Sequence, residues 1–293
     1  MKKSPLTSFK QSSFNKAVNL LDTEFIILRD LIHEKLGIFY HESKRDLIED
    51  KLSDLVLAQG FTSFLDYYYL LKYDIASTGE WKQVVDALRV PETFFWREFE
   101  QVQTLVKVLV PQYFAQYQPY PLKIWSAACS TGEEPLSIVM ALNEAGWFKK
   151  GAAIEIIASD LSYMALQRAQ QGLFRPYSFR KLPEDLRNKY FKAEGESWRI
   201  SPELVARIRW VPANLTVKNE IISLANAHII FCRNVFIYFS EDMIRKVLRN
   251  FFELMPAPGH LFVSVSESLL KLTTDFQLQE IGGTFVYVKP KNL

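Results

Sequence analysis

Hydrophobic residues recur at spacings of three and four along the first third of the chain, which is typical of helices with one buried face. The segments with this pattern are 22–37, 42–60, 61–74 and 78–90. The apolar positions of the first segment are Phe25, Leu28, Ile32 and Leu36. The pattern predicts a domain of about four helices over residues 21–90. Residues 1–20 are polar and predict a flexible N-terminal arm.

After Pro91 the pattern changes to short apolar runs that are rich in β-branched and aromatic residues. The runs are "PLKIWSAACS", "AAIEIIASD", "RIRWVPANL", "AHIIFCRNV", "HLFVSVSES" and "GTFVYVKP". Amphipathic segments separate them, at 97–110, 134–146, 162–172 and 240–255. Strands that alternate with helices and are apolar throughout predict an α/β domain over residues 91–293, with a mainly parallel sheet covered on both faces. Within it, "YFKAEGESWRISPEL" predicts two short strands around a turn, and we place a small inserted subdomain over 175–205.

Composition narrows the class of protein. The chain has 293 residues, 48 % of them hydrophobic, and a formal net charge of +2, which does not favour nucleic acid as a partner. It shows neither a signal peptide nor an apolar run of about 18 residues, so we expect a cytoplasmic protein without a membrane span. Cys129 and Cys232 lack the spacing of zinc ligands and the four histidines are scattered, so we expect no metal site.

Ligands of open parallel sheets bind at the carboxyl ends of the strands, where this chain places several polar residues. The run 122–127 leads into "AACSTGEEP", in which small residues and Gly132 allow the backbone to approach a ligand. The loop is neither a dinucleotide fingerprint nor a phosphate loop. Glu133 and Glu134 would repel a phosphate but could bind an amine or a cation. The alternative interpretation is an ordinary capped helix start.

Polar residues at the ends of the next runs suggest a nucleoside ligand. Asp160 stands where a carboxylate binds ribose hydroxyls in nucleotide-binding folds, although it could equally cap the following helix. Asn214 could recognise the edge of adenine or belong to a turn. Arg233 and Asn234 interrupt the apolar run "IIFCRNVFIYF", and an unpaired buried guanidinium would be costly, so we expect them to face the ligand cleft. A nucleoside bound beside carboxylates without a phosphate site favours S-adenosylmethionine.

Five blocks of sequence resemble the CheR family, the glutamate methyltransferases of chemotaxis receptors. They are "PETFFWRE", "IWSAACSTGEEPLSI", "IIASDLSYMALQRAQQGLF", "VPANL" and "FCRNVFIYF", and the resemblance covers about residues 20–290. It implies an N-terminal helical domain, a seven-stranded Rossmann-like methyltransferase domain that binds S-adenosylmethionine, and a small antiparallel β-subdomain inserted in it. The implied reaction forms methyl esters on glutamate side chains of receptor helices and leaves S-adenosylhomocysteine as product.

The resemblance also implies roles for individual residues. Those expected to bind the cofactor are Thr93, Arg97, Ala127, Glu134, Asp160, Leu161, Asn214, Leu215, Arg233 and Asn234. Arg97 and Tyr238 are expected to meet the substrate carboxylate. A glutamate is already ionised at pH 7, so the reaction needs orientation rather than a general base. Without the resemblance, Arg97 could be a surface residue of the 97–110 helix and Tyr238 a core aromatic.

The chain departs from the family at several positions. Pro91 stands where asparagine is frequent, and Ser266–Glu267 keep only part of a Gly-His-Ser-Glu pattern. The helical domain carries eight Lys and Arg against 13 Asp and Glu over residues 20–90, a net charge of −5, where known members present a basic face to the receptor. The hairpin in "YFKAEGESWRI" is short, so we expect no dependence on a receptor C-terminal pentapeptide.

Two other functions remain open at this stage. The first is a methyltransferase that acts on another protein, a nucleic acid or a small molecule, although the Asn/Asp-Pro-Pro-aromatic strand end of DNA amino-methylating enzymes is absent. The second is a catalytically silent adaptor that binds S-adenosylmethionine or S-adenosylhomocysteine in a chemosensory pathway. Release of a base-labile methyl group from a labelled receptor distinguishes the enzyme from the adaptor.

Overall fold

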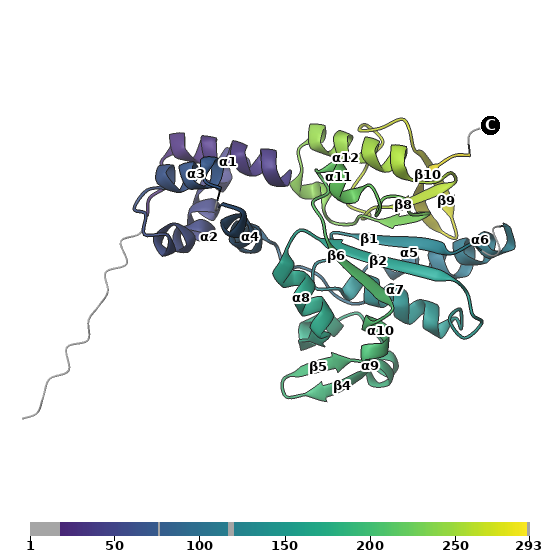
Figure 1. The fold of residues 1–293 in the computed structure, drawn as a ribbon. Coiled ribbons are helices and arrows are strands. Elements are labelled where there is room, and N and C mark those ends of the chain that lie inside the picture. The colour runs from purple at the N-terminus through teal and green to yellow at the C-terminus, as the bar shows by residue number, and fades with distance from the viewer. Residues whose placement is uncertain (1–17, 76, 117–119, 292–293) are drawn as a thin grey trace, which may run out of the picture.

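The computed structural model describes residues 18–75, 77–116 and 120–291. Most of the predicted arm, residues 1–17, therefore lies outside the described residues. Figure 1 shows two bodies, a helical one formed by the N-terminal part of the chain and a larger one built around a sheet. The expected α/β fold with an N-terminal helical domain is confirmed.

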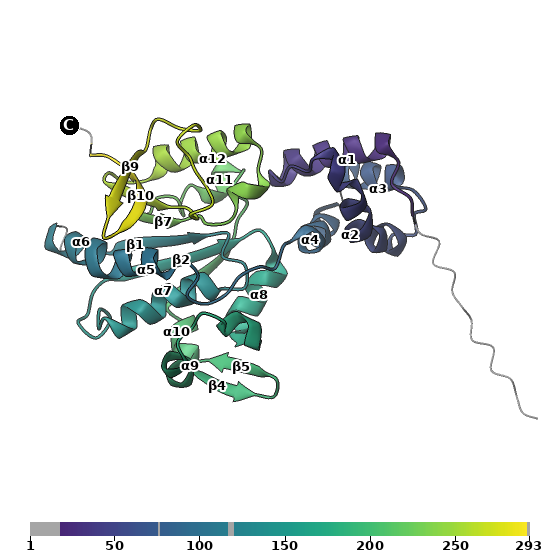
Figure 2. The ribbon, with the colours of Figure 1, turned by 180° about the vertical axis from the view of Figure 1, so that it is seen from behind.

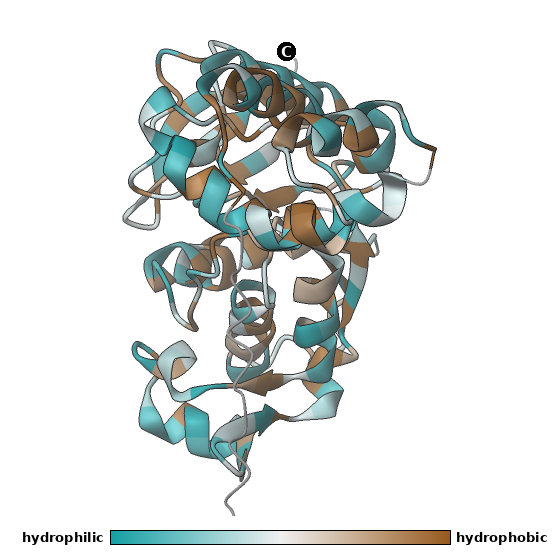
Figure 3. Ribbon diagram, turned by 90° about the vertical axis from the view of Figure 1, so that its left-hand side faces the viewer, coloured by the Kyte–Doolittle hydropathy of each residue, from teal (hydrophilic) through white to brown (hydrophobic). Residues whose placement is uncertain are grey.

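The helical body consists of α1 (Asp22–Leu36), η1 (Glu42–Lys44), α2 (Arg45–Ala58), α3 (Phe64–Tyr73) and α4 (Ser77–Leu88). Its core is formed by the apolar faces that the spacing predicted, with Leu28, Ile32 and Leu52 fully buried. Helix α1 ends at Gly37, whose φ of 79° is the left-handed conformation that glycine adopts without strain. Figure 3 shows hydrophobic and hydrophilic stretches alternating along the helices, as amphipathic helices require.

The large sheet has seven strands in the order β6-β2-β1-β7-β8-β10-β9. The strands are β1 (Leu122–Ala127), β2 (Ile154–Asp160), β6 (Ile208–Pro212), β7 (Ile229–Phe231), β8 (Gly259–Phe262), β9 (Gln277–Ile281) and β10 (Thr284–Lys289). The first five in spatial order are parallel, and β10 is antiparallel to both of its neighbours. Strand β9 was not predicted because it is an exposed edge strand without a continuous apolar run.

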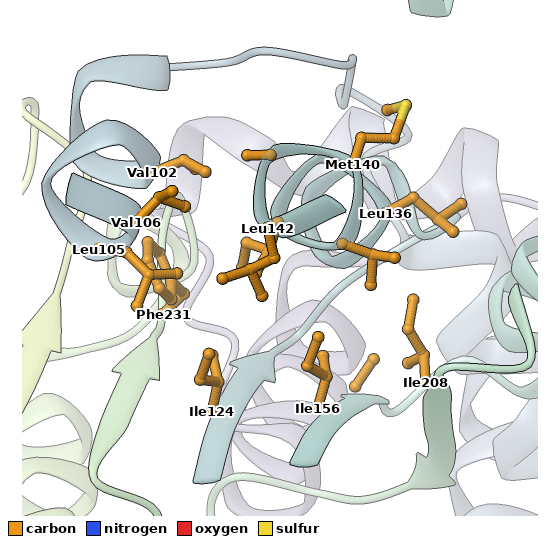
Figure 4. Close-up of a cluster of buried hydrophobic side chains, with 14 of the residues drawn as sticks. Val102, Leu105, Val106, Ile124, Leu136, Met140, Leu142, Ile156, Ile208 and Phe231 are labelled. Carbon is orange, nitrogen blue, oxygen red and sulfur yellow. The ribbon is translucent and has the colours of Figure 1, made fainter. Parts of the chain in front are cut away.

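Alternate residues of each strand face opposite sides of the sheet, and helices cover both sides. Ile124 and Phe231 face the helices of one side, which Figure 4 shows in close-up. That side is covered by α5 (Phe99–Thr104), η2 (Leu105–Leu109), α6 (Val110–Gln116), α7 (Glu133–Glu144) and α8 (Tyr163–Gln171). Trp125 and Ile230 face the other side, which is covered by α11 (Lys218–Ile221) and α12 (Glu241–Leu254). Burial on both faces explains the uninterrupted apolar runs.

A second, three-stranded antiparallel sheet forms a separate subdomain, with strand order β3-β5-β4. Its elements are β3 (Leu173–Phe174), η3 (Pro176–Phe179), α9 (Glu184–Tyr190), β4 (Phe191–Glu194), β5 (Ser197–Ile200) and α10 (Pro202–Val205). Figure 2 shows it on the side of the large sheet away from α12. Phe95, from the segment that connects the two bodies, packs between Phe174, Phe179 and Phe191. This aromatic cluster anchors the connecting segment to the subdomain.

The helical body docks against the carboxyl ends of the parallel strands. The side-chain amide of Asn214, just after β6, donates to the carbonyl of Lys35 at 2.8 Å. The backbone N–H of Phe39 donates to the carbonyl of Tyr238 at 2.8 Å, beside a bridge between Ile38 and Phe239. The loops that follow β6 and β7 are therefore in contact with the helical body.

Two histidines at the opposite ends of the strands predict a loss of stability in acid. Burial lowers the pKa of His228 and of His260 to about 4, from an ordinary value near 6.5. Between these pH values the unfolded chain binds more protons than the folded one, so the free energy of unfolding falls as the pH drops from about 6.5 towards 4. We expect the variant His228→Gln/His260→Gln to show a flatter dependence in urea unfolding at pH 7 and pH 5. An unchanged slope would contradict this assignment.

Candidate functional site

Asp160 closes strand β2 and connects the two loops beside it. Its carboxylate accepts one hydrogen bond from the backbone N–H of Ser130 and one from that of Ser162, both at 2.8 Å. Burial raises the pKa of this carboxyl group, and the two N–H donors act in the opposite direction. Each carboxylate oxygen has two lone pairs, so each can still accept a bond from a ligand hydroxyl.

Glu134 and Arg233 form a buried ion pair that joins α7 to the loop after β7. The Arg233 Nε lies 2.6 Å from a carboxylate oxygen of Glu134, and the side chains are 3 % and 13 % exposed. The other oxygen of Glu134 accepts from the Ser126 hydroxyl at 2.6 Å. The Arg233 Nη1 donates to the carbonyl of Arg97 at 2.9 Å. The guanidinium therefore lies inside a polar junction and connects the first strand's loop to the segment that carries Arg97.

Among the residues that the structure describes, five other than glycine adopt positive φ angles, and all lie in the segments around this junction. They are Trp96, Glu98, Ala128, Ser130 and Asn234, with φ between 47° and 63°. Left-handed backbone at such residues costs energy and is concentrated at functional sites. The surrounding contacts must hold these loops in place.

The packing around residue 132 gives a reason for glycine at this position that the sequence analysis did not consider. The φ of Gly132 is 93°, and a Cβ there would lie 2.8 Å from the Cβ of Ala169 and 2.9 Å from the ring of Trp210. The lack of a side chain thus allows α7 to pack against α8 and β6. Close approach of the Gly132 backbone to a ligand stays a prediction.

Arg97 and Tyr238 lie close enough for the charge of the arginine to act on the phenol. Burial raises the pKa of Tyr238, while Arg97 lowers it. The phenol therefore stays protonated near neutral pH and can donate a hydrogen bond. Arg97 Nη1 donates to the carbonyl of Glu92 at 2.9 Å. Tyr40 of the helical body is also near, because the interaction with Tyr238 adds to the burial that raises the pKa of Tyr40 to about 12.

The other predicted cofactor residues take different positions. Ala127 and Leu215 are buried in the apolar core, and Thr93 is partly exposed. Leu161 packs against the core of the helical body. The side chain of Asn214 is already used by the carbonyl of Lys35 and, through its oxygen, by the N–H and hydroxyl of Thr216. The binding roles of these five residues stay predictions.

Glu267 is a residue of the site whose role the sequence did not reveal. One carboxylate oxygen accepts from the backbone N–H groups of Asn234 and Ser264, both at 2.9 Å. The other accepts from Val235 and Phe236 at 2.8 and 2.9 Å and from Ile237 at 3.4 Å. Burial raises the pKa of Glu267. This single side chain holds the loop between Arg233 and Tyr238, and the partial Ser-Glu motif was its only sign in the sequence.

We expect the variant Glu267→Gln to unfold with a free energy lower by about 1–3 kcal/mol, because the amide nitrogen would face N–H donors that the carboxylate now satisfies. Urea unfolding followed by circular dichroism measures the change. Glu196→Gln is the matched control, since Glu196 is exposed in the turn of the β4–β5 hairpin. Equal stability of both variants would show that the loop does not depend on the carboxylate.

A cavity of about 230 Å³ lies at the opposite ends of the strands, away from this junction. It is lined partly by Leu122, Ile229 and His260, at the starts of β1, β7 and β8. It contains none of the site residues described in this subsection. We place the functional site at the carboxyl ends instead, because the buried carboxylates, the ion pair and the left-handed backbone converge there.

Comparisons with known proteins identify both parts of the chain. Residues 91–284 match the family model of the CheR methyltransferase S-adenosylmethionine-binding domain, and residues 23–88 match that of the CheR methyltransferase all-alpha domain. "Chemotaxis protein methyltransferase 2" of Vibrio cholerae is 35 % identical over 274 residues, which cover 92 % of this chain and 94 % of that protein. "Chemotaxis protein methyltransferase" of Escherichia coli is 31 % identical over 277 residues, 93 % of each.

Proposed function

The chain belongs to the CheR methyltransferase family, and we propose that it transfers the methyl group of S-adenosylmethionine to glutamate side chains of chemoreceptors, forming glutamyl methyl esters. The names of the relatives support methylation in chemotaxis, and the matched family model supports the cofactor. The choice of glutamate oxygen as acceptor is our inference from Arg97 and Tyr238.

The residues at the carboxyl ends of the strands fit this cofactor. Asp160 is a partly buried carboxylate with free lone pairs, as ribose hydroxyls require. Asp160 and the buried Glu133 make the loops around α7 acidic, whereas the charge of Glu134 is paired with Arg233, and this favours a sulfonium and an amine over a phosphate. When bound, S-adenosylmethionine supplies a methyl group on a positively charged sulfur. We expect Asp160 to hold its ribose and Glu134, with Arg233, its amino-acid part.

The protein's part in the reaction is orientation of the acceptor. A glutamate carboxylate is ionised near pH 7, so no residue has to remove a proton. Arg97 can bind one carboxylate oxygen by a charge-assisted hydrogen bond and leave the other free. The neutral phenol of Tyr238 can donate a second bond. Holding the acceptor oxygen in line with the methyl group supplies the rate enhancement that positioning gives.

One observation carries the proposal: a single buried guanidinium connects the expected cofactor side to the expected acceptor side. Arg233 pairs with Glu134 at 2.6 Å and binds the carbonyl of Arg97 at 2.9 Å. Arg233 therefore fixes the position of the expected methyl-donor side relative to the expected acceptor side. A protein that only bound the cofactor would not need Arg97 to be held in this way.

The test is methylation of receptor cytoplasmic fragments with S-adenosylmethionine labelled on the methyl group. Alkali releases methanol from a methyl ester but leaves methylated nitrogen intact, so base-labile label measures glutamyl ester formation. We expect such label in fragments that contain glutamates and none after these glutamates are replaced by alanine. Cofactor binding without any base-labile label would favour the silent adaptor and overturn the proposal.

The proposed partners are the cytoplasmic helices of chemoreceptors, in the cytoplasm. Within the described ranges no helix is long and apolar enough to cross a membrane. The hairpin has only two residues between β4 and β5, so we keep the proposal that the protein acts without a receptor pentapeptide tether. Micromolar binding of that peptide would contradict it. We likewise propose the division into a helical domain, residues 21–90, and a methyltransferase domain, residues 91–293, with the insertion at 175–205.

A further inference from the structure

Charge is distributed very unevenly between the two parts of the chain that flank the site. Residues 20–90, which include the helical body, carry a net charge of −5. Residues 175–209, which include most of the subdomain, contain nine Lys and Arg against five Asp and Glu, a net charge of +4. A substrate that offers glutamates is itself acidic. The helical body repels such a substrate and the subdomain attracts it.

A row of cations leads from the proposed acceptor site onto the subdomain. The guanidinium of Arg97 lies 5.4 Å from the centre of the Phe94 ring, and that of Arg180, just after η3, lies 3.5 Å from the same ring. Arg180 is fixed further by Glu92, at 2.5 Å, and by the ring of Tyr177, at 3.9 Å. Arg180 therefore lies on the same ring as Arg97, with its charge already paired with Glu92.

The cations around Arg180 are available for a partner. Arg175 and Lys181 flank η3, both are exposed, and neither lies within 4.0 Å of a carboxylate among the described residues. Arg187, Lys189 and Arg199 of the subdomain are already engaged by carboxylates, and so are several cations of the helical body. Arg29 pairs with Asp30, Arg45 pairs with Asp22 and Asp46, and Lys51 donates to the carbonyls of Ala87 and Arg89.

We propose that the η3 surface, defined as Arg175 and Lys181 on either side of Arg180, binds acidic residues of the receptor helix that flank the glutamate to be methylated. This inference rests on the proposed function and specifies how its substrate is recognised. The helical body then approaches the substrate through its uncharged or apolar groups rather than through a basic face. The η3 surface then recognises its substrate by complementary charge outside the reacting centre. Such contacts change the binding of the substrate more than the rate of the chemical step.

The test uses the full-length variant Arg175→Glu/Lys181→Glu, which leaves Arg180 and its packing on Phe94 intact. The matched control is Lys149→Glu/Lys271→Glu, which makes the same change of charge at exposed positions elsewhere. A third variant, Lys44→Glu, probes the helical body. The substrates are a receptor cytoplasmic fragment and the same fragment with the acidic neighbours of its methylated glutamates replaced by glutamine.

At low salt we expect the η3 double variant to raise KM for the acidic fragment about tenfold, with kcat and KM for S-adenosylmethionine unchanged. The control and Lys44→Glu should stay near the wild type, and the difference should shrink in high salt and with the neutralised fragment. An unchanged KM in the η3 variant, or a larger effect of Lys44→Glu, overturns the inference. In that case the proposed function still stands as long as the wild-type protein forms the methyl ester. No ester from wild-type protein overturns both.

Discussion

Replacing Arg97 by alanine is expected to lower kcat for methyl transfer by about 10²- to 10³-fold, the cost of removing one well-placed group that orients or stabilises the reacting atoms. The side chain is held at the acceptor side by its bond to the Glu92 carbonyl and its contact with Phe94. Its backbone carbonyl stays bound to Arg233 after truncation, so the fold and the cofactor side should be nearly unchanged.

Initial rates with labelled S-adenosylmethionine measure this effect, and calorimetry with S-adenosylhomocysteine checks that the cofactor still binds. Arg97→Lys tests geometry, because lysine keeps the charge but loses the planar fork, and we expect it to recover only part of the rate. Arg199→Ala is the control, since Arg199 pairs with Glu194 on the exposed hairpin. Wild-type turnover by Arg97→Ala would remove Arg97 from the catalytic site.

Arg233→Met is expected to lower the free energy of unfolding by about 3–5 kcal/mol, the usual cost of leaving one member of a buried ion pair without its partner. The substitution isolates the Glu134 carboxylate and leaves the carbonyl of Arg97 without its donor. Affinity for S-adenosylhomocysteine and methyl transfer should both be lost, because the loops on each side of the junction lose their common support.

The second variant in this series, Arg233→Met/Glu134→Gln, separates stability from function. It removes the stranded charge, so urea unfolding should show that part of the lost stability returns. Calorimetry should show no return of S-adenosylhomocysteine binding, since neither charge is restored. If Arg233→Met alone is as stable as the wild type, the ion pair is not what holds the loops.

The strands near the centre of the sheet were predictable because burial on both faces leaves a continuous apolar run. Strands β1 and β2 end at Ala127 and Asp160, as the runs predicted. Strand β6 ends at Pro212, two residues earlier than expected. Strand β9 is exposed along nearly its whole length, so no hydrophobic signal marked it.

The sequence predicted that the site lies at the ends of the strands. It did not predict which side chains and backbone groups contact one another there. Arg233 is 99 residues from Glu134, and its other partners include backbone carbonyls, which have no signature in the sequence. The same is true of the bond from Asn214 to the carbonyl of Lys35 and of the five N–H groups that Glu267 accepts. Such contacts depend on where folded loops meet, which local patterns do not encode.

The pairing of residues 38–40 with Tyr238 and Phe239 has a consequence for how the two bodies work together. The phenol proposed to touch the substrate belongs to one body, but the strand-like segment that braces it belongs to the other. Cutting the chain near residue 90 would therefore leave Tyr238 without this contact, and it would also remove Lys35, whose carbonyl Asn214 binds. If Tyr238 meets the substrate as proposed, we expect a displacement of the helical body to move the segment that contacts Tyr238 and so to change the rate of methyl transfer.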